Sequence, residues 1–531
     1  MNKNISFSFR EVCTKTFLYL LAVVVCLTGT GTFHKVLAFD RVGKYQVYEI
    51  KLIADAVVAN PFDTYLLKVE LVSPGGRRFV IDGFFDGDGA GGQDGRVWKA
   101  RISPDEAGMW NWRTVPGDGA ASCLLGRHGR FECIDSDDLG GLVGDGRYFR
   151  FQEGGYVFLQ GNFLDFSTGL PSTHVYMSEK ITDRERAGIL ARQRDFHKAN
   201  KINVYFANKG DYGGLATSPW VKSGSGYDRS RMDLARWTQF DQYLQDFKNA
   251  GMFAEMWFFA DDSGFGGIPQ ADKNRLFRYA MARTSAYSHT LYVIALEWQE
   301  GWSLESVRNS GNFIQQRNPW DRLLSVHSLP SSKPDSFRSF LAWIYAKLFS
   351  SIIYSEEPWA DFIASQAGNS ATPQDVNALA IQVGRLEQIP HLSEEFGVLR
   401  ANQDLRLMRN MWANFLGGAA GGGTGSNIAA LMSFLDRTKV PFFRMKPFND
   451  LCSEGGNHIF CAAEHGKHYL VYSMGYDFEI KVEGRGLSGY WYDPFKSDAI
   501  LSKPFEVSPG KQKFSLPEKN KDWVLWITTT M

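Results

Sequence analysis

The pattern of apolar and polar positions divides the chain into three parts. In residues 39–146, short runs such as Tyr48–Ile53 and Val97–Ile102 alternate or cluster apolar residues, and turns rich in Pro, Gly and Asp separate them. This pattern predicts a small β-sandwich. Runs of the same kind return in residues 439–531, for example His468–Tyr472, and predict a second small β-sandwich domain.

The central residues 147–438 alternate short apolar runs with amphipathic helical patterns. In the clearest helix, Leu234, Trp237, Phe240, Leu244 and Phe247 recur every three to four residues. Eight strand–helix units fit into this stretch, which predicts an α/β fold, a (β/α)8 TIM barrel flanked by the two β-sandwich domains. The expected strands are residues 156–163, 201–207, 252–259, the first part of 291–302, 322–326, 359–364, 389–393 and 417–425.

Residues 1–38 have the composition of a targeting segment rather than of a folded domain. Lys3, Arg10 and Lys15 precede the apolar run Phe17–Leu27, and Ala38 offers a small residue for cleavage. The run is short for a bilayer span, so we expect no stable membrane anchor. The sequence therefore predicts a signal peptide over residues 1–38 and a mature protein that is secreted or periplasmic.

Export makes the cysteines of the mature chain informative, because disulfides persist in oxidising compartments. Cys123 and Cys133 flank one likely turn, and Cys452 and Cys461 flank another, so each pair is predicted to form a disulfide. With four cysteines, three connectivities stay open. Neither a Cys-x-x-Cys motif nor a His at metal-ligand spacing from these cysteines favours a metal site, and none is expected.

Composition excludes partners that need a strong electrostatic field. Lys plus Arg and Asp plus Glu both number 58, so nothing favours nucleic acid, and a neutral polymer is compatible with this balance. The stretch Gly87–Gly92 matches GxGxxG, but no helical pattern or βαβ unit surrounds it. A dinucleotide site is therefore not predicted, and no cofactor is expected.

The candidate site residues lie where the predicted barrel strands end, the place at which barrel enzymes carry their chemistry. Glu297 and Glu300 follow the fourth strand, and Glu394 and Glu395 end the seventh. Two carboxylates can cleave a glycosidic bond, since one handles the proton and the other attacks or stabilises the anomeric carbon. The other polar and aromatic residues expected to bind a carbohydrate substrate at these ends are Asn162, Asp165, Asn208, Asp211, Trp257, Gln299, His327 and Gln366.

Several stretches resemble parts of clan A glycoside hydrolases. VSPGGRRFVIDGFFDGDG and GRVWKARISPDEAGMWNWRT resemble the N-terminal sandwich that precedes many of these barrels, and GYWYDP resembles a turn of the small β-domain that closes them. VIALEWQE and PHLSEEFG resemble the fourth- and seventh-strand signatures of the clan, especially of the group related to apiosidases.

This resemblance implies roles for single residues. Glu300 matches the acid/base and Glu395 the nucleophile of a retaining glycoside hydrolase. The chain departs from the clan at Gln299, where the clan has Asn, so Glu297 and Glu394 stay open as alternative catalytic residues. The departure also leaves open a catalytically inactive carbohydrate-binding protein on the same barrel.

Overall fold

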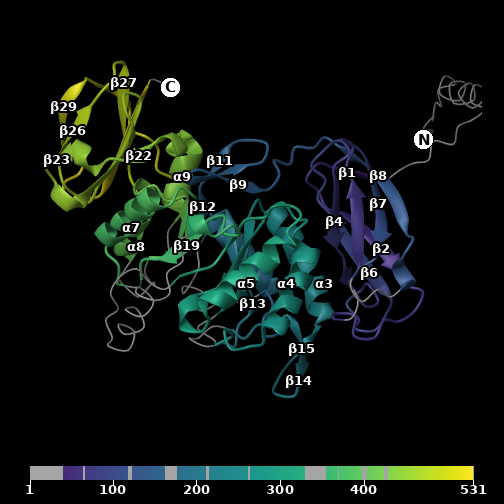
Figure 1. Ribbon diagram of the computed structural model, residues 1–531. Coiled ribbons are helices and arrows are strands. Elements are labelled where there is room, and N and C mark those ends of the chain that lie inside the picture. The colour runs from purple at the N-terminus through teal and green to yellow at the C-terminus, as the bar shows by residue number, and fades with distance from the viewer. Residues whose placement is uncertain are drawn as a thin grey trace, which may run out of the picture. The chain divides into compact units, whose positions relative to one another are not determined.

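The computed structural model describes most of the chain after the predicted signal peptide (Figure 1). No helix within these residues is both long and apolar enough to cross a membrane. The predicted signal peptide and the site candidates Asn162, Asp165 and Asp211 lie outside the described residues. The described ranges are 40–63, 66–117, 122–161, 176–210, 215–260, 264–328, 354–368, 370–396, 404–423 and 428–529.

The N-terminal strands form two antiparallel-rich sheets, one five-stranded in the order β1-β8-β7-β3-β4 and one three-stranded in the order β2-β6-β5. Side chains alternate between the two faces of these strands; in β3, Val69 and Leu71 are buried, whereas Lys68, Glu70 and Val72 are more exposed. Trp98 of the smaller sheet and Trp110 and Phe131 of the larger one belong to one buried core. The bounds are β1 (Arg41–Gly43), β2 (Tyr48–Ile53), β3 (Lys68–Val72), β4 (Arg78–Asp82), β5 (Phe84–Phe85), β6 (Val97–Ile102), β7 (Gly108–Val115), η1 (Ser122–Leu124) and β8 (His128–Ile134).

The predicted disulfides are wrong, since Cys123, Cys133, Cys452 and Cys461 are all free thiols. The first pair is separated by the length of β2. The Cys123 carbonyl accepts a hydrogen bond from Asp55, beyond one end of this strand, whereas the Tyr48 ring at its other end stacks on the ring of Phe131, near Cys133. Six residues of strand span roughly 17 Å, well beyond the ~7 Å that a disulfide allows between Cα atoms.

The second pair, Cys452 and Cys461, is in contact but not bonded. The two side chains hydrogen-bond to each other, and this bond together with burial raises the pKa of the Cys461 thiol. A raised pKa disfavours the thiolate, which is the reactive form in disulfide exchange.

The central region contains two parallel four-stranded sheets, in the orders β13-β16-β17-β18 and β12-β21-β20-β19. Their edges meet at two places. The Asn200 amide donates to the Gln160 carbonyl at 3.1 Å, next to β13 and β12, and a parallel bridge pairs His327 with Ala364, next to β18 and in β19. The bounds are β12 (Leu159–Gln160), β13 (Lys201–Ala207), β16 (Phe253–Phe259), β17 (Thr290–Ala295), β18 (Leu324–Ser325), β19 (Ile363–Gln366), β20 (His391–Glu395) and β21 (Gly421–Gly422).

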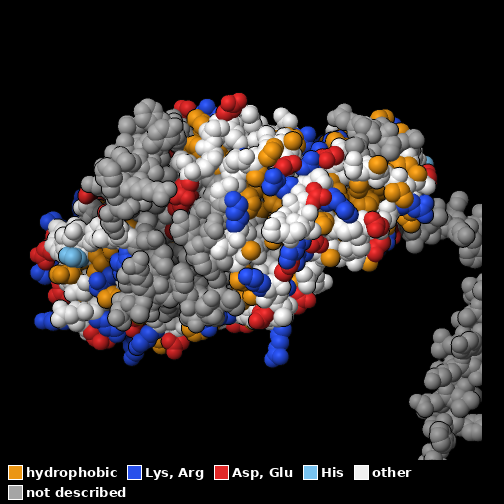
Figure 2. All heavy atoms as spheres, turned by 90° about the horizontal axis from the view of Figure 1, so that it is seen from below, with side chains coloured by type: hydrophobic (Ala, Val, Ile, Leu, Met, Phe, Trp, Pro, Cys, Tyr) orange, Lys and Arg blue, Asp and Glu red, His pale blue; other side chains and the backbone are white. Residues whose placement is uncertain are grey.

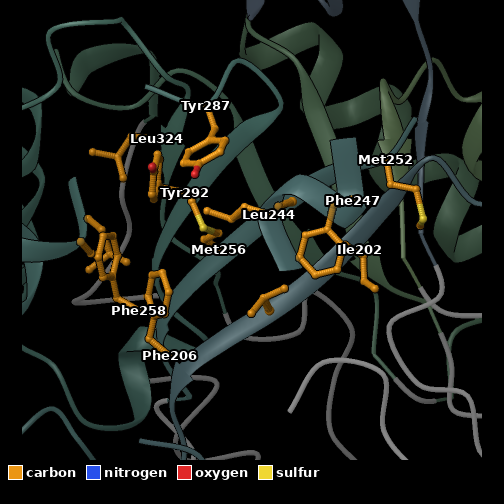
Figure 3. Close-up of a cluster of buried hydrophobic side chains, with 14 of the residues drawn as sticks. Ile202, Phe206, Leu244, Phe247, Met252, Met256, Phe258, Tyr287, Tyr292 and Leu324 are labelled. Carbon is orange, nitrogen blue, oxygen red and sulfur yellow. The ribbon is translucent and has the colours of Figure 1, made fainter. Parts of the chain in front are cut away.

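Helices cover the outer face of these strands, which explains why strands such as β13 and β16 are buried along their whole length. In Figure 3, Phe206 of β13 and Phe258 of β16 lie in one apolar cluster with Leu244 and Phe247 of helix α3. The Asp233 side chain caps α3 by accepting from the Arg236 amide. The helices are α2 (Asp183–Ala191), α3 (Leu234–Asn249), α4 (Gln270–Thr284), α5 (Leu304–Gln315), α7 (Pro373–Leu386), α8 (Asp404–Leu416) and α9 (Ala429–Thr438).

The elements before and after β13 differ from the expectation. The helical segment before β13 divides into α2 and a π-helical turn at Arg192–Phe196, a break that no residue pattern in this stretch indicates. Between β13 and α3, an antiparallel hairpin pairs β14 (Trp220–Ser223) with β15 (Gly226–Met232). This hairpin is largely exposed and polar, so it lacks the apolar alternation that reveals a strand in a sequence.

Two further groups of antiparallel strands flank the parallel sheets. A short sheet in the order β11-β10-β9 precedes β12, and the C-terminal strands form a six-stranded sheet, β22-β24-β25-β30-β27-β28, and a three-stranded sheet, β23-β26-β29. The bounds are β9 (Leu142–Asp145), β10 (Tyr148–Phe151), β11 (Tyr156–Val157), β22 (Lys446–Pro447), β23 (Cys452–Ser453), β24 (Ile459–Glu464), β25 (His468–Ser473), β26 (Phe478–Val482), β27 (Leu487–Tyr492), β28 (Phe505–Val507), β29 (Gly510–Phe514) and β30 (Trp523–Thr529).

A buried ionic network connects the N-terminal strands to helices α3 and α4. Arg101 of β6 donates to both carboxylate oxygens of Asp241 in α3, at 2.8 and 2.6 Å. Arg283 of α4 donates to the same carboxylate at 2.7 Å and to Asp86 at 2.7 Å. Lys99 of β6 lies 2.9 Å from the second oxygen of Asp86, so each carboxylate has two cationic partners.

Candidate functional site

Glu297 follows strand β17 in an unusual backbone conformation. Its φ of 43° and ψ of 47° lie in the left-handed region, which a residue with a Cβ rarely adopts. Two neighbours hold it there: the Glu297 amide donates to His327 Nδ1 at 3.3 Å, and Gln366 Nε2 donates to Glu297 Oε1. Non-glycine residues in this conformation cluster at functional sites.

Glu300 lies one short turn further, in η6 (Trp298–Glu300). Its amide donates to the Glu297 carbonyl at 2.9 Å, and the side chains of Glu297 and Glu300 also hydrogen-bond to each other. Although part of Glu300 reaches solvent, burial of the rest of its carboxyl group raises its pKa, and the bond to Glu297 only partly offsets this. Two acidic side chains that share a hydrogen bond are well suited to hold one proton.

The two acids of strand β20 differ in their exposure. Glu394 is fully buried. Glu395 is half-buried at the end of β20, where a register shift pairs it with Gln366 of β19.

Gln366 therefore lies between the two acidic strand ends. It pairs with Glu395 through the backbone and bonds Glu297 through its side chain. His327 connects the ends of β17 and β19. It pairs with Ala364 of β19 and accepts a hydrogen bond from the amide of Glu297, which follows β17. We call Glu297, His327, Gln366 and Glu395 the rim residues; the sequence places them up to 98 positions apart, and the fold gathers them on adjoining strands.

Beneath the rim residues lies a charged cluster that joins Glu394 to Lys201 and Glu255, two residues that were not among the sequence-based candidates. Lys201 Nζ contacts Oε2 of Glu255 at 2.5 Å and Oε2 of Glu394 at 2.7 Å. Asn203 Nδ2 donates to the same Glu255 oxygen at 2.9 Å. The only signal in the sequence is a polar residue at every second position of β13 and one acid within the apolar β16.

Two candidate ligands turn out to be interior residues. Trp257 is fully buried, with its ring 5.3 Å from Tyr205 and 5.2 Å from His327, so it is not an exposed platform for a sugar. His327 is fully buried as well, and burial followed by the Lys201 charge lowers its pKa to about 3. His327 is thus neutral near pH 7, and its Nδ1 is the acceptor for Glu297.

The remaining described candidates lie at or near strand ends. Asn208 is buried after β13, pairs with Thr217, and accepts from the Gly210 amide at 2.9 Å. Gln299 is half-buried in η6 between Glu297 and Glu300. The Asn208 side chain thus bonds to its own loop, whereas Gln299 lies next to the acidic residue Glu300 in the chain.

Two further features of the described residues concern metal ligands and surface charge. Within the described ranges, no group of three or more His, Cys, Asp or Glu side chains could hold a metal ion. On the face seen in Figure 2, Lys and Arg side chains are interspersed with Asp and Glu. A mixed surface of this kind suits a neutral partner better than a polyanion.

Comparison with known proteins identifies one domain by sequence. Residues 41–116 match DUF5060, a domain of unknown function, which fits the accompanying N-terminal domain expected from the resemblance. A search of curated proteins with this sequence found no match.

Solved structures share the fold over most of the chain. A candidate glycoside hydrolase from Bacteroides vulgatus ATCC 8482 is similar with a TM-score of 0.69 and 16% identity, over 92% of this chain and 100% of the other. A glycoside hydrolase family 5 structure from the same organism gives a TM-score of 0.56 and 14% identity, over 74% of this chain and 93% of that chain. A structure described as a glycoside hydrolase gives 0.55 and 14%, over 74% and 97%. The resemblance to glycoside hydrolases seen in the sequence is therefore confirmed at the level of the fold.

Proposed function

We propose that this chain is a secreted or periplasmic glycoside hydrolase that cleaves O-glycosidic bonds of a poly- or oligosaccharide with retention of configuration. The observation that carries the proposal is the position of Gln366, which bonds Glu297 at the end of β17 and pairs with Glu395 at the end of β20. The reaction needs two acids at strand ends on the same edge of the parallel strands, and Gln366 connects the end of β17 to the end of β20 across β18 and β19.

In this proposal, residues 147–438 form one closed (β/α)8 barrel between β-sandwich domains at 39–146 and 439–531. The contacts that link the two four-stranded sheets support closure. Asn200 bonds Gln160 at one junction, and His327 pairs with Ala364 at the other. The ion pair between Lys201 of one sheet and Glu394 of the other adds a third link.

Glu300 is proposed as the acid/base. An acid must carry a proton near neutral pH, and burial raises the pKa of Glu300 in that direction. Glu297 then holds and orients Glu300, since its carboxylate is itself fixed by Gln366 and bonded to Glu300.

Glu395 is proposed as the nucleophile. A nucleophile must reach the anomeric carbon, and Glu394 is fully buried with one oxygen bonded to Lys201, whereas Glu395 is only half-buried. In the first step the Glu395 carboxylate bonds to the anomeric carbon while the leaving oxygen takes the proton of Glu300. In the second step Glu300 removes a proton from water, which displaces Glu395 and releases the sugar.

The test incubates the purified full chain with a panel of plant and algal polysaccharides and measures new reducing ends. Hydrolysis by the wild type and its loss in Glu395→Ala are the expected results, and a 2-fluoro glycoside should label the Glu395 peptide covalently. Binding to a polysaccharide without any product would instead support the catalytically inactive carbohydrate-binding protein. Wild-type turnover by Glu395→Ala would exclude this residue as nucleophile.

A further inference from the structure

We infer that Lys201 is a positioning residue. It fixes the strand end that carries Glu395, because it forms an ion pair with the neighbouring Glu394 from the other four-stranded sheet. The inference rests on the proposed function for the role of Glu395. It assigns a task to a lysine that lies in the barrel interior and, being fully buried, does not touch substrate.

The contacts show that Lys201 is the main restraint on Glu394. Lys201 Nζ lies 2.7 Å from Glu394 Oε2, and Asn203 Nδ2 reaches the same oxygen only at 3.4 Å. The other oxygen, Oε1, has no hydrogen-bond partner among the described residues. Without the lysine, the Glu394 carboxylate would be held by a single long hydrogen bond.

The charges explain why the ion pair between Lys201 and Glu394 is strong. Lys201, Glu255 and Glu394 have no exposed side-chain surface, so one ammonium group and two carboxyl groups share a space without water. Burial and the charge of Glu394 raise the pKa of Glu255, whereas both carboxylates raise the pKa of Lys201 against the opposing effect of burial. The ammonium group stays charged and pairs with Glu394. Removing the ammonium group would leave a buried carboxylate without its cationic partner, which destabilises a protein far more than the loss of a surface ion pair.

Glycines show that the backbone approaches the cluster closely from two sides. A Cβ on Gly423, just after β21, would come within 2.4 Å of the Glu394 carbonyl oxygen and 2.9 Å of its Oε2. A Cβ on Gly161, just after β12, would lie 3.0 Å from the Lys201 carbonyl oxygen. The cluster therefore fills the junction of β12, β13, β20 and β21, one residue from Glu395.

The test compares Lys201→Met with Arg409→Met, a control that removes the ion pair of α8 with Asp522, remote from the cluster. Hydrogen exchange is followed for the peptide 391–396, together with kcat and KM. Lys201→Met should lose most protection in this peptide and at least tenfold in kcat with KM within twofold. Arg409→Met should keep the protection and both constants. If Lys201→Met unfolds, the double variant Lys201→Met/Glu394→Gln, which leaves no unpaired charge on Glu394, should restore folding but not the protection of 391–396.

Two results would overturn the inference. One is wild-type protection of 391–396 and wild-type kcat in Lys201→Met. The other is a Glu394→Gln variant as inactive as Glu395→Ala but with unchanged exchange, which would make Glu394 the nucleophile itself. A wild type that hydrolyses nothing would refute the proposed function, yet the exchange measurement would still decide whether Lys201 fixes β20.

Discussion

Gln366 in β19 donates a hydrogen bond from Nε2 to Oε1 of Glu297, the residue that β17 delivers in a left-handed conformation. The two residues are 69 positions apart, and no local pattern connects them. The bond fixes the direction of the Glu297 carboxylate, and this carboxylate is hydrogen-bonded to Glu300. The uncharged side-chain amide of Gln366 thereby orients Glu297, and through Glu297 it also orients Glu300.

Replacing Gln366 with Leu should lower kcat/KM by about 10- to 100-fold, since a hydrogen bond to a charged group contributes ~1.5–3 kcal/mol. Leu keeps most of the volume and removes the donor. Gln374→Leu in α7 is the matched control, because the Gln374 Nε2 donates to the carbonyl of the exposed residue Asn457. Steady-state kinetics on the substrate found in the panel checks the prediction, and equal losses in both variants would contradict it.

Glu300→Gln should impair substrates with poor leaving groups most. An aglycone that departs without protonation bypasses the acid, so aryl glycosides with acidic phenols should retain most of the glycosylation rate. The ratio of rates for a nitrophenyl glycoside and a natural disaccharide should rise by at least tenfold in the variant. Glu305→Gln, at the first turn of α5, serves as the control. An unchanged ratio would remove Glu300 from the role of acid.

Asp241→Asn should destabilise the fold by about 3–5 kcal/mol, because it deprives two buried guanidinium groups of their shared carboxylate. Although burial opposes the shift, Arg101 and Arg283 lower the pKa of Asp241 to about 2. A depressed pKa means that the stabilisation is complete above about pH 4 and is lost only as the pH falls through about 2. Urea unfolding at pH 7 and pH 5 should show the same difference. Asp436→Asn, whose side chain is 79% exposed, should change stability by less than about 0.5 kcal/mol.

His289→Gln should make the stability of the fold less dependent on pH under mildly acidic conditions. Burial, followed by the Lys248 charge, lowers the pKa of His289 from 6.5 to about 3, and its Nε2 lies 2.8 Å from the Leu244 carbonyl oxygen. Between these two values the unfolded chain binds a proton that the folded chain does not. Stability therefore falls as the pH drops from about 6.5 towards 3, with a slope of up to ~1.4 kcal/mol per pH unit from this group. Thermal unfolding from pH 7 to pH 5 checks the slope, and His128→Gln, at an exposed position, should keep that of the wild type.

The strands were predictable where both faces are buried, because a short run dominated by branched and aromatic apolar residues can be recognised without knowledge of its neighbours. Residues 201–207 were expected as a strand and are β13, and 252–259 differ from β16 by one residue. The hairpin of β14 and β15 was not predictable, since its exposed residues follow no apolar period.

The site was predictable only in part, for the same physical reason. The acids after β17 and in β20 stand out because charge interrupts an apolar run. The partners of these acids do not stand out: Lys201 meets Glu255 and Glu394 across 54 and 193 residues. The predicted Cys123–Cys133 disulfide failed because proximity in sequence says little about the two ends of a sandwich, whereas Cys452 and Cys461 do meet but remain free thiols. Such pairings follow from strand order, which no short motif encodes.

The left-handed conformation of Glu297 has a thermodynamic implication for this protein. A glutamate held there costs on the order of 1–3 kcal/mol, and glycine or asparagine would adopt the same angles more easily. Glu297→Gly relieves this strain but also removes the hydrogen bond from Gln366, which contributes ~1.5–3 kcal/mol, so thermal unfolding should give a melting temperature close to that of the parent while kcat/KM falls. The native sequence keeps a strained residue where glycine would be unstrained, and it thereby places a carboxylate at this position.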